Sequence, residues 1–161
     1  MRSPAPRLNR PRIRPLGGWR VPPAARLLAL AGLVPFFGLA LLSLSGEAWA
    51  RPPLLLYGAT ILSFLGAIHW GAVLRAPESE AGWDWPRLTL GVLPPLLAWV
   101  ALLLPPYWTA VLLILGLMLT VIVESWAARF HAVAPRSWLR LRWLLSIGAS
   151  ASLFLGGLLL L

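Results

Sequence analysis

The chain has 161 residues, of which 59% are hydrophobic and 12% charged, and its mean hydropathy is +0.79. Because a soluble domain carries roughly 25% charged residues, this composition excludes an ordinary soluble enzyme and indicates a polytopic membrane protein. All 14 basic residues are arginines, and the formal net charge is +9. These arginines lie between apolar runs, which favours membrane topology over nucleic-acid binding as their explanation. The absence of cysteine excludes disulfides and thiolate metal sites.

Residues 1–26 differ from the rest of the chain, because they hold seven arginines, six prolines and no acidic residue. Proline opposes regular helix and like charges repel one another, so this segment is predicted to be a disordered cytoplasmic tail. An organelle transit peptide is the alternative, although such peptides form amphipathic helices that this proline density disfavours.

Five apolar runs follow, and each is close to the ~20 residues that a spanning helix needs. The runs are continuous and do not alternate as membrane strands would, so they predict helices. We therefore expect an all-α membrane protein with a five-helix domain over residues 27–161. A cleaved signal peptide is the alternative for the first run, because Ala48-Trp49-Ala50 resembles a cleavage site. The expected spans are 27–44, 54–74, 88–104, 109–128 and 143–161.

The distribution of arginine predicts the orientation. If the tail lies inside, 13 of the 14 arginines fall on inner segments and Arg51 alone falls outside. The positive-inside rule then places the N-terminus inside and the C-terminus outside. Arg136, Arg140 and Arg142 alternate with tryptophan and leucine before the last run, and we expect them to lie along the inner headgroups. The expected location is the bacterial inner (cytoplasmic) membrane, with the mitochondrial inner membrane as the alternative.

Small residues recur at helical spacing in two of the runs, which is the pattern of close helix packing in lipid. The third run contains Pro94 and Pro95, so a kink is predicted there and the carbonyls of Leu90 and Gly91 lose their usual helical donors. The predicted packing seams are Ala59, Ser63, Gly66, Ala67 and Gly71 in the second run and Gly148, Ser152 and Gly156 in the fifth.

Two ionisable side chains lie within predicted spans. His69 is six residues before Arg75, and Glu124 is five residues before Arg129. Both helices are expected to run from outside to inside, so the two groups share one depth, roughly 7–9 Å from the inner boundary. Buried ionisable groups usually pair. We expect the two to form a polar site, or to share a pocket with the Leu90 and Gly91 carbonyls; the alternative is that Glu124 extends towards Arg129 at the surface.

Four segments resemble the transmembrane protein 69-like family, a family of unknown function found in bacteria and mitochondria. The resemblance covers about residues 24–161 and implies a five-helix inner-membrane protein with no assigned reaction. Members of this family often carry arginine where His69 stands and an acid late in the fourth helix, as Glu124 is here, which implies a basic–acidic relation between the two positions. The matching segments are residues 31–36, 57–71, 93–99 and 135–142.

No catalytic signature accompanies these features. The sequence contains no G-x-S-x-G, H-E-x-x-H or P-loop motif, and its two histidines and Glu124 do not predict a metal or haem site. We expect no cofactor and no enzymatic activity. The first hypothesis is an accessory or assembly component of a membrane complex, with other membrane subunits or a second copy as partners. The second is a carrier or binder of a lipid, quinone or ion, which would use a pocket in the inner leaflet half.

Overall fold

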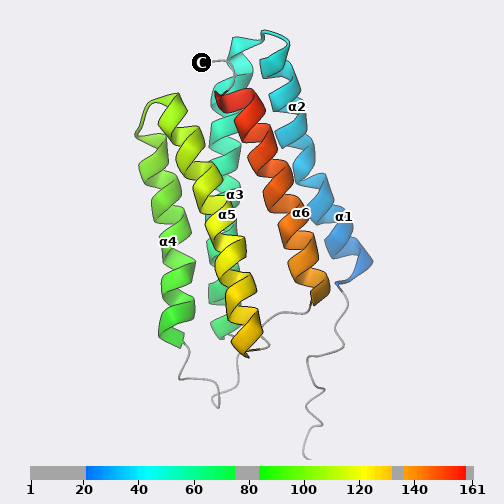
Figure 1. Ribbon diagram of the computed structural model, residues 1–161, viewed down its shortest axis with the longest axis vertical. Coiled ribbons are helices and arrows are strands. Elements are labelled where there is room, and N and C mark those ends of the chain that lie inside the picture. The colour runs from blue at the N-terminus through cyan, green and yellow to red at the C-terminus, as the bar shows by residue number, and fades with distance from the viewer. Residues whose placement is uncertain (1–20, 75–83, 132–135, 159–161) are drawn as a thin grey trace, which may run out of the picture.

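The computed structural model describes residues 21–74, 84–131 and 136–158, and the elements within them are helical. Two consecutive helices, separated by a break at Gly32, form the first pass, and a π-helical turn extends the last one (Figure 1). The described part of the chain therefore makes five passes, as expected. The elements are α1 (Pro23–Ala31), α2 (Leu33–Leu44), the short η2 (Ala48–Ala50), α3 (Arg51–Leu74), α4 (Asp84–Leu102), α5 (Pro106–His131), α6 (Arg136–Leu153) and η4 (Phe154–Leu158).

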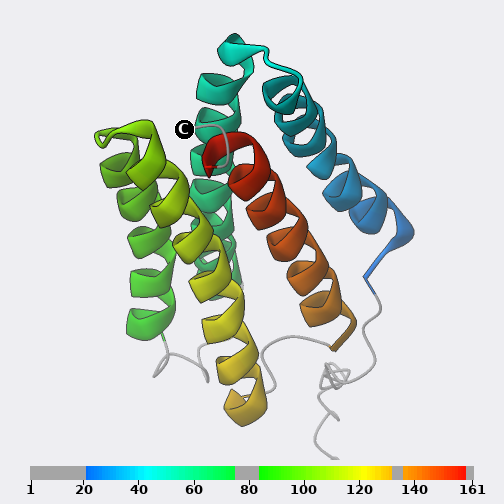
Figure 2. The same cartoon turned by 45° about the horizontal axis from the view of Figure 1, so that its top comes forward.

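The helices form one elongated bundle. Helix α4 lies at one edge and α1–α2 at the opposite edge, with α3, α5 and α6 between them (Figures 1 and 2). Helix α3 packs against α2, α4 and α5, and α6 packs against α2 and α5. The core between them is built from leucine and alanine, as in Leu54, Leu62, Leu113 and Leu153, which are fully buried.

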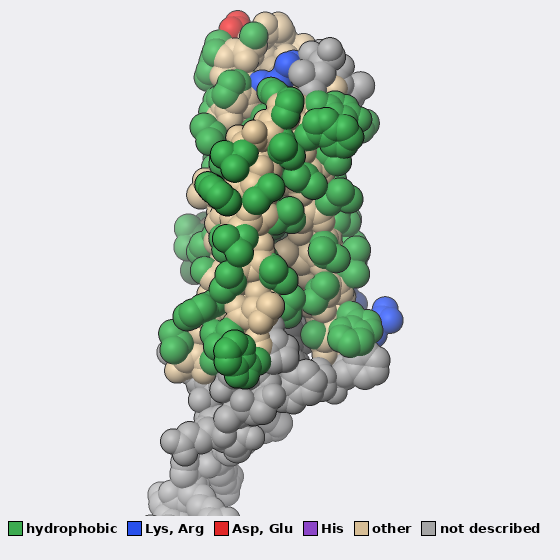
Figure 3. All heavy atoms as spheres, turned by 90° about the vertical axis from the view of Figure 1, so that its left-hand side faces the viewer, with side chains coloured by type: hydrophobic (Ala, Val, Ile, Leu, Met, Phe, Trp, Pro, Cys, Tyr) green, Lys and Arg blue, Asp and Glu red, His purple; other side chains and the backbone are tan. Residues whose placement is uncertain are grey.

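The outer surface of the bundle is rich in large hydrophobic side chains. Large hydrophobic side chains such as Leu28, Phe64 and Leu119 are more than half exposed, and Figure 3 shows hydrophobic side chains along the length of one face. Four passes are long and apolar enough to cross a membrane, whereas the apolar part of α4, Arg87–Leu102, is shorter. An apolar surface of this extent fits lipid and not water, so the chain is an all-α transmembrane protein.

The described helices begin earlier than the apolar runs. Helix α1 begins at Pro23, which is wrong for the part of the expected disordered tail that covers residues 23–26; residues 1–20 of that tail lie outside the described residues. Proline is well suited to the first turn of a helix because its missing N–H would have no partner there. The same reason explains why α5 begins at Pro106 and why Pro52 and Pro53 fit the first turn of α3.

Helix α4 remains helical through Pro94 and Pro95, from Asp84 to Leu102. Pro95 has no N–H to offer the Gly91 carbonyl four residues earlier. A Cβ atom built on Gly66 of α3 would lie 2.5 Å from that carbonyl oxygen, so the oxygen lies against the α-hydrogen of Gly66. Pro95 therefore leaves the Gly91 carbonyl without its helical donor, and the carbonyl oxygen lies against Gly66 of α3 in the position of a Cα–H···O contact.

The two predicted seams differ in what they contact. Gly148 of α6 packs against Leu33, and Gly156 of η4, the turn that extends α6, packs against Ala40 and Leu54. Ser43 of α2 donates a hydrogen bond of 2.8 Å to the Gly156 carbonyl. This seam, which also includes the buried Ser152, therefore joins α6 to α2.

The stripe on α3 is divided. Ala59 and Gly66 are buried, Ser63 is half-buried, and Ala67 and Gly71 are exposed. A Cβ atom built on Gly71 would meet no atom within 4 Å. Ala67 and Gly71 are therefore not buried by another helix of this chain, and their part in a packing seam stays a prediction.

Candidate functional site

Three ionisable side chains from three helices meet inside the bundle. Glu124 of α5 accepts two hydrogen bonds from Arg142 of α6, 2.9 Å from Nε and 2.8 Å from Nη2. His69 of α3 lies near the same carboxylate, with its Nε2 atom 3.6 Å from Glu124 Oε1. The structure thus brings together the two residues that the sequence singled out, and it adds a third.

The network is shielded from its surroundings. The Arg142 side chain is 2% exposed, that of Glu124 is 11% exposed and that of His69 is 20% exposed. An isolated charge at such a place would cost several kcal/mol, and pairing with good geometry offsets that cost. Two parallel N–H···O bonds between a guanidinium and a carboxylate are the strongest arrangement of this type. The Glu124–Arg142 pair is therefore the main interaction, with His69 as a weaker third member.

The prediction that Arg142 lies along the membrane surface is wrong. Helix α6 begins at Arg136, well before the expected start at residue 143, so Arg142 lies one and a half turns inside the helix. Arg142, Ser146, Ala149 and Leu153 are all buried, and this spacing defines the inward face of α6. Arg136 and Arg140, which the same prediction placed at the surface, are exposed.

The Leu90 and Gly91 carbonyls do not join His69 in the arrangement that the sequence suggested. Trp70, the residue after His69, lies against Gly91, because a Cβ atom built on Gly91 would overlap its indole ring. A second contact does accompany the ion pair: the Trp143 indole nitrogen donates a hydrogen bond of 3.0 Å to Ser125 Oγ. Two consecutive residue pairs therefore join α5 to α6.

A cavity of about 170 Å³ lies beside the charge network. Its walls are largely apolar, and Phe64 and Leu28 flank it on the outer surface of α3 and α1. Arg142, Ser146 and Trp138 are the lining residues with polar side-chain atoms. The buried Ser146 hydroxyl has no hydrogen-bond partner. A buried hydroxyl without a partner is uncommon in folded proteins. The Ser146 hydroxyl is therefore a polar group of the cavity that a bound molecule could satisfy.

The charge network can pair helices, because Glu124 of α5 contacts His69 of α3 and Arg142 of α6. In the described parts of the chain, no group of three or more His, Cys, Asp or Glu residues could hold a metal ion. The carboxylate of Glu124 is engaged by two cationic or polar partners, so its first role is to hold α3, α5 and α6 together.

Comparison with known proteins decides the family. The family model described as "Protein of unknown function (DUF3429)" matches residues 21–158. The chain belongs to this family. The matched region contains all three members of the charge network and every described helix.

Curated relatives support the assignment. Transmembrane protein 69 of Xenopus tropicalis is 46% identical over 105 residues, which cover 60% of this chain and 40% of that protein. Transmembrane protein 69 of Mus musculus is 40% identical over 87 residues, covering 51% of this chain and 34% of the relative. The matched part thus spans about two fifths or less of these relatives. No solved structure matches the chain.

Proposed function

We propose that this protein is a non-catalytic accessory or assembly component of a membrane complex, and that α3 and α4 receive a transmembrane helix of a partner subunit. The supporting observation is an open groove of about 380 Å³ on their outer surface. Residues from both helices line it: Ser63, Ala67, Trp70, Gly91, Val92, Pro95 and Leu96.

The shape of this groove suits a helix. Ala67 and Gly71 extend along α3 at a four-residue spacing and are exposed, so a second backbone can approach closely at both positions. The partner is expected to offer small side chains of its own at the contact. In a bilayer, the association of helices depends on such close packing, because lipid tails are as apolar as the side chains and no hydrophobic effect drives the helices together.

A substitution at Gly71, which lies beside the groove four residues along α3 from Ala67, tests the proposal without disturbing the bundle. Gly71→Leu adds a side chain where a Cβ atom meets nothing within 4 Å, so the fold is expected to persist. Gly38→Leu is the matched control, because Gly38 is also exposed on its helix and open to the same distance. Mild detergent extraction, native gels and mass spectrometry should find a stoichiometric partner with wild type and Gly38→Leu, and lose it with Gly71→Leu. A wild-type chain that migrates alone would refute the accessory role.

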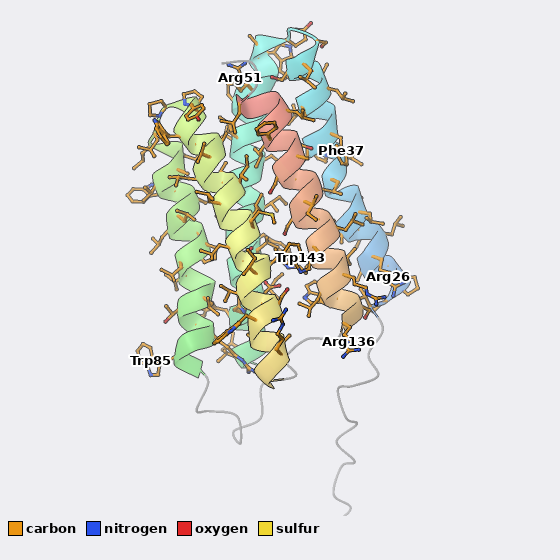
Figure 4. All side chains as sticks on the ribbon, viewed as in Figure 1. Arg26, Phe37, Arg51, Trp85, Arg136 and Trp143 are labelled. Carbon is orange, nitrogen blue, oxygen red and sulfur yellow. The ribbon has the colours of Figure 1, made fainter. Side chains whose placement is uncertain are left out.

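We also propose that the membrane is the bacterial cytoplasmic membrane and that the N-terminus lies on its inner side. The support is the distribution of arginine together with the bundle: Arg26 and Arg136 lie at one end and Arg51 at the opposite end (Figure 4). The positive-inside rule assigns the end with more arginines to the cytoplasm.

A second candidate function, binding a lipid-soluble molecule such as a quinone or a lipid, is favoured by the cavity beside Arg142. Its volume of about 170 Å³ resembles that of cavities of roughly 150 Å³ that take up one benzene ring. Ser146 and Arg142 are both hydrogen-bond donors, so a ring or chain with an uncharged carbonyl fits best. Glu124 already neutralises Arg142, which disfavours an anion.

Two buried serines on α6 allow a controlled test of this second function. The Ser146 and Ser150 hydroxyls are both buried without partners, but Ser146 alone lines the cavity. A short-chain quinone added to the purified protein should raise the melting temperature of wild type and Ser150→Ala, and raise it less for Ser146→Ala. Equal shifts in all three would eliminate the cavity as the binding site.

A further inference from the structure

Three exposed arginines surround a groove between α5 and α6 near one end of the bundle. Arg129 comes from α5, and Arg136 and Arg140 come from α6. The groove has a volume of about 550 Å³, and its floor contains Ser125, Ala128, Leu139 and Trp143. We propose that this groove binds the phosphate of an anionic phospholipid headgroup.

The charge of the groove supports an anionic ligand. No acidic side chain is among the described residues that line it. Glu124, the acid nearest along α5, is held by Arg142 on the inner side of α6. Helix α6 begins at Arg136, so the positive end of its dipole lies at the same place. Helix α5 ends at His131, so the negative end of its dipole lies near Arg129 and opposes the start of α6. The net positive charge of the groove therefore comes from the three guanidinium groups.

The depth of the groove favours a lipid over a soluble anion. Arg129 is the last residue of one apolar span, Pro106–Arg129, and Arg136 is the first residue of the next, Arg136–Leu158. Basic residues at such a boundary lie at the level of lipid phosphates. Leu139 and Trp143 continue the floor into the apolar part of the bundle, where acyl chains can lie. Trp143 is held in place by its hydrogen bond to Ser125, so the floor is preformed.

The test is a lipid titration of the full chain in detergent, read by native mass spectrometry. The probes are phosphatidylglycerol, phosphatidylcholine with the same acyl chains, and inorganic phosphate. Each of Arg129→Gln, Arg136→Gln and Arg140→Gln should lower the affinity for phosphatidylglycerol about fivefold, which corresponds to the ~1 kcal/mol per arginine near a membrane surface. Phosphatidylcholine binding should not change.

Arg26→Gln is the matched control, because Arg26 is exposed at the same end of the bundle but outside the groove (Figure 4). It should leave phosphatidylglycerol affinity unchanged, and the melting temperatures of all four variants should match wild type. The proposal is overturned if Arg26→Gln weakens binding as much as the groove variants do, or if the two lipids bind equally. Inorganic phosphate that binds as tightly as phosphatidylglycerol, with the same dependence on the arginines, would assign the groove to a soluble anion and overturn the lipid assignment.

Discussion

Removal of Arg142 should be among the most destabilising single changes in this protein. The Arg142→Leu variant leaves the Glu124 carboxylate largely buried with only His69 beside it, 3.6 Å away. Breaking one partner of a buried ion pair costs about 3–5 kcal/mol in protein interiors, because the remaining charge has no compensation. We therefore expect Arg142→Leu to lower the free energy of unfolding by about 3 kcal/mol or more. Glu124→Leu should have an effect of similar size, since it leaves the guanidinium without its partner.

The double variant distinguishes pairing from simple burial. Glu124→Leu and Arg142→Leu together replace the pair by two apolar side chains, which is often neutral or stabilising. The double variant should thus be more stable than either single variant, with a coupling energy of several kcal/mol. His69→Leu should cost less, because its nitrogen is farther from Glu124 than the arginine nitrogens are.

Unfolding in mixed micelles with increasing dodecyl sulfate provides the measurement. The chain contains ten tryptophans, so their fluorescence reports the transition without a label. Polar contacts between transmembrane helices have averaged only ~0.6 kcal/mol in double-mutant cycles. A Glu124–Arg142 coupling at or below that value would show that the pair is an ordinary polar contact and not the main interaction between α5 and α6.

Three further predictions concern packing and topology. Gly66→Ala should lower the free energy of unfolding by about 1–3 kcal/mol, because its methyl group would lie 2.5 Å from a carbonyl oxygen of α4. Gly38→Ala is the control: its methyl group would meet nothing within 4 Å, so the micelle unfolding curve should not change. Ser43→Ala removes the 2.8 Å hydrogen bond from α2 to the Gly156 carbonyl and should lower the free energy of unfolding by about 1 kcal/mol in the same assay. No change would mean that water or lipid donates to the Gly156 carbonyl equally well. Because the chain has no native cysteine, single cysteines can report orientation: in intact bacteria an impermeant maleimide should label Ser45→Cys and not Ala24→Cys, and the reverse labelling would invert the proposed topology.

The sequence was sufficient to predict the passes but not the helix ends. Continuous apolar runs identify five passes because a helix must satisfy its own backbone in lipid. They say less about where each helix begins, because proline and arginine interrupt the apolar pattern and still fit the first turn. Pro23, Arg51, Pro106 and Arg136 all begin helices within segments that hydropathy alone treats as loops.

The sequence likewise predicted part of the candidate site, namely two of its three residues. His69 and Glu124 are at similar distances from the ends of helices that run in the same direction, so depth alone predicted that they could meet. Arg142 was missed because its assignment depended on the start of α6. Arg142 lies four residues before Ser146 and seven before Ala149, a spacing that places all three on one face of a helix. That spacing was the available signal that Arg142 points inward. Small-residue spacing, likewise, could not reveal which residues of α3 face α4 and which face outward.

The ion pair also bears on how the chain enters the membrane. Glu124 and Arg142 are only 18 residues apart and lie on consecutive helices, so both are available as soon as α6 has been synthesised. Inserting either helix alone would place an unpaired charge in lipid. The cost is ~2.5–3.5 kcal/mol at the centre of a span and is smaller at the depth of Glu124 and Arg142, nearer the inner boundary. Inserting α5 and α6 together, as a hairpin closed by the Glu124–Arg142 and Ser125–Trp143 contacts, presents the translocon with a neutral pair. The ion pair therefore favours joint partition of α5 and α6 into lipid over insertion of either helix alone.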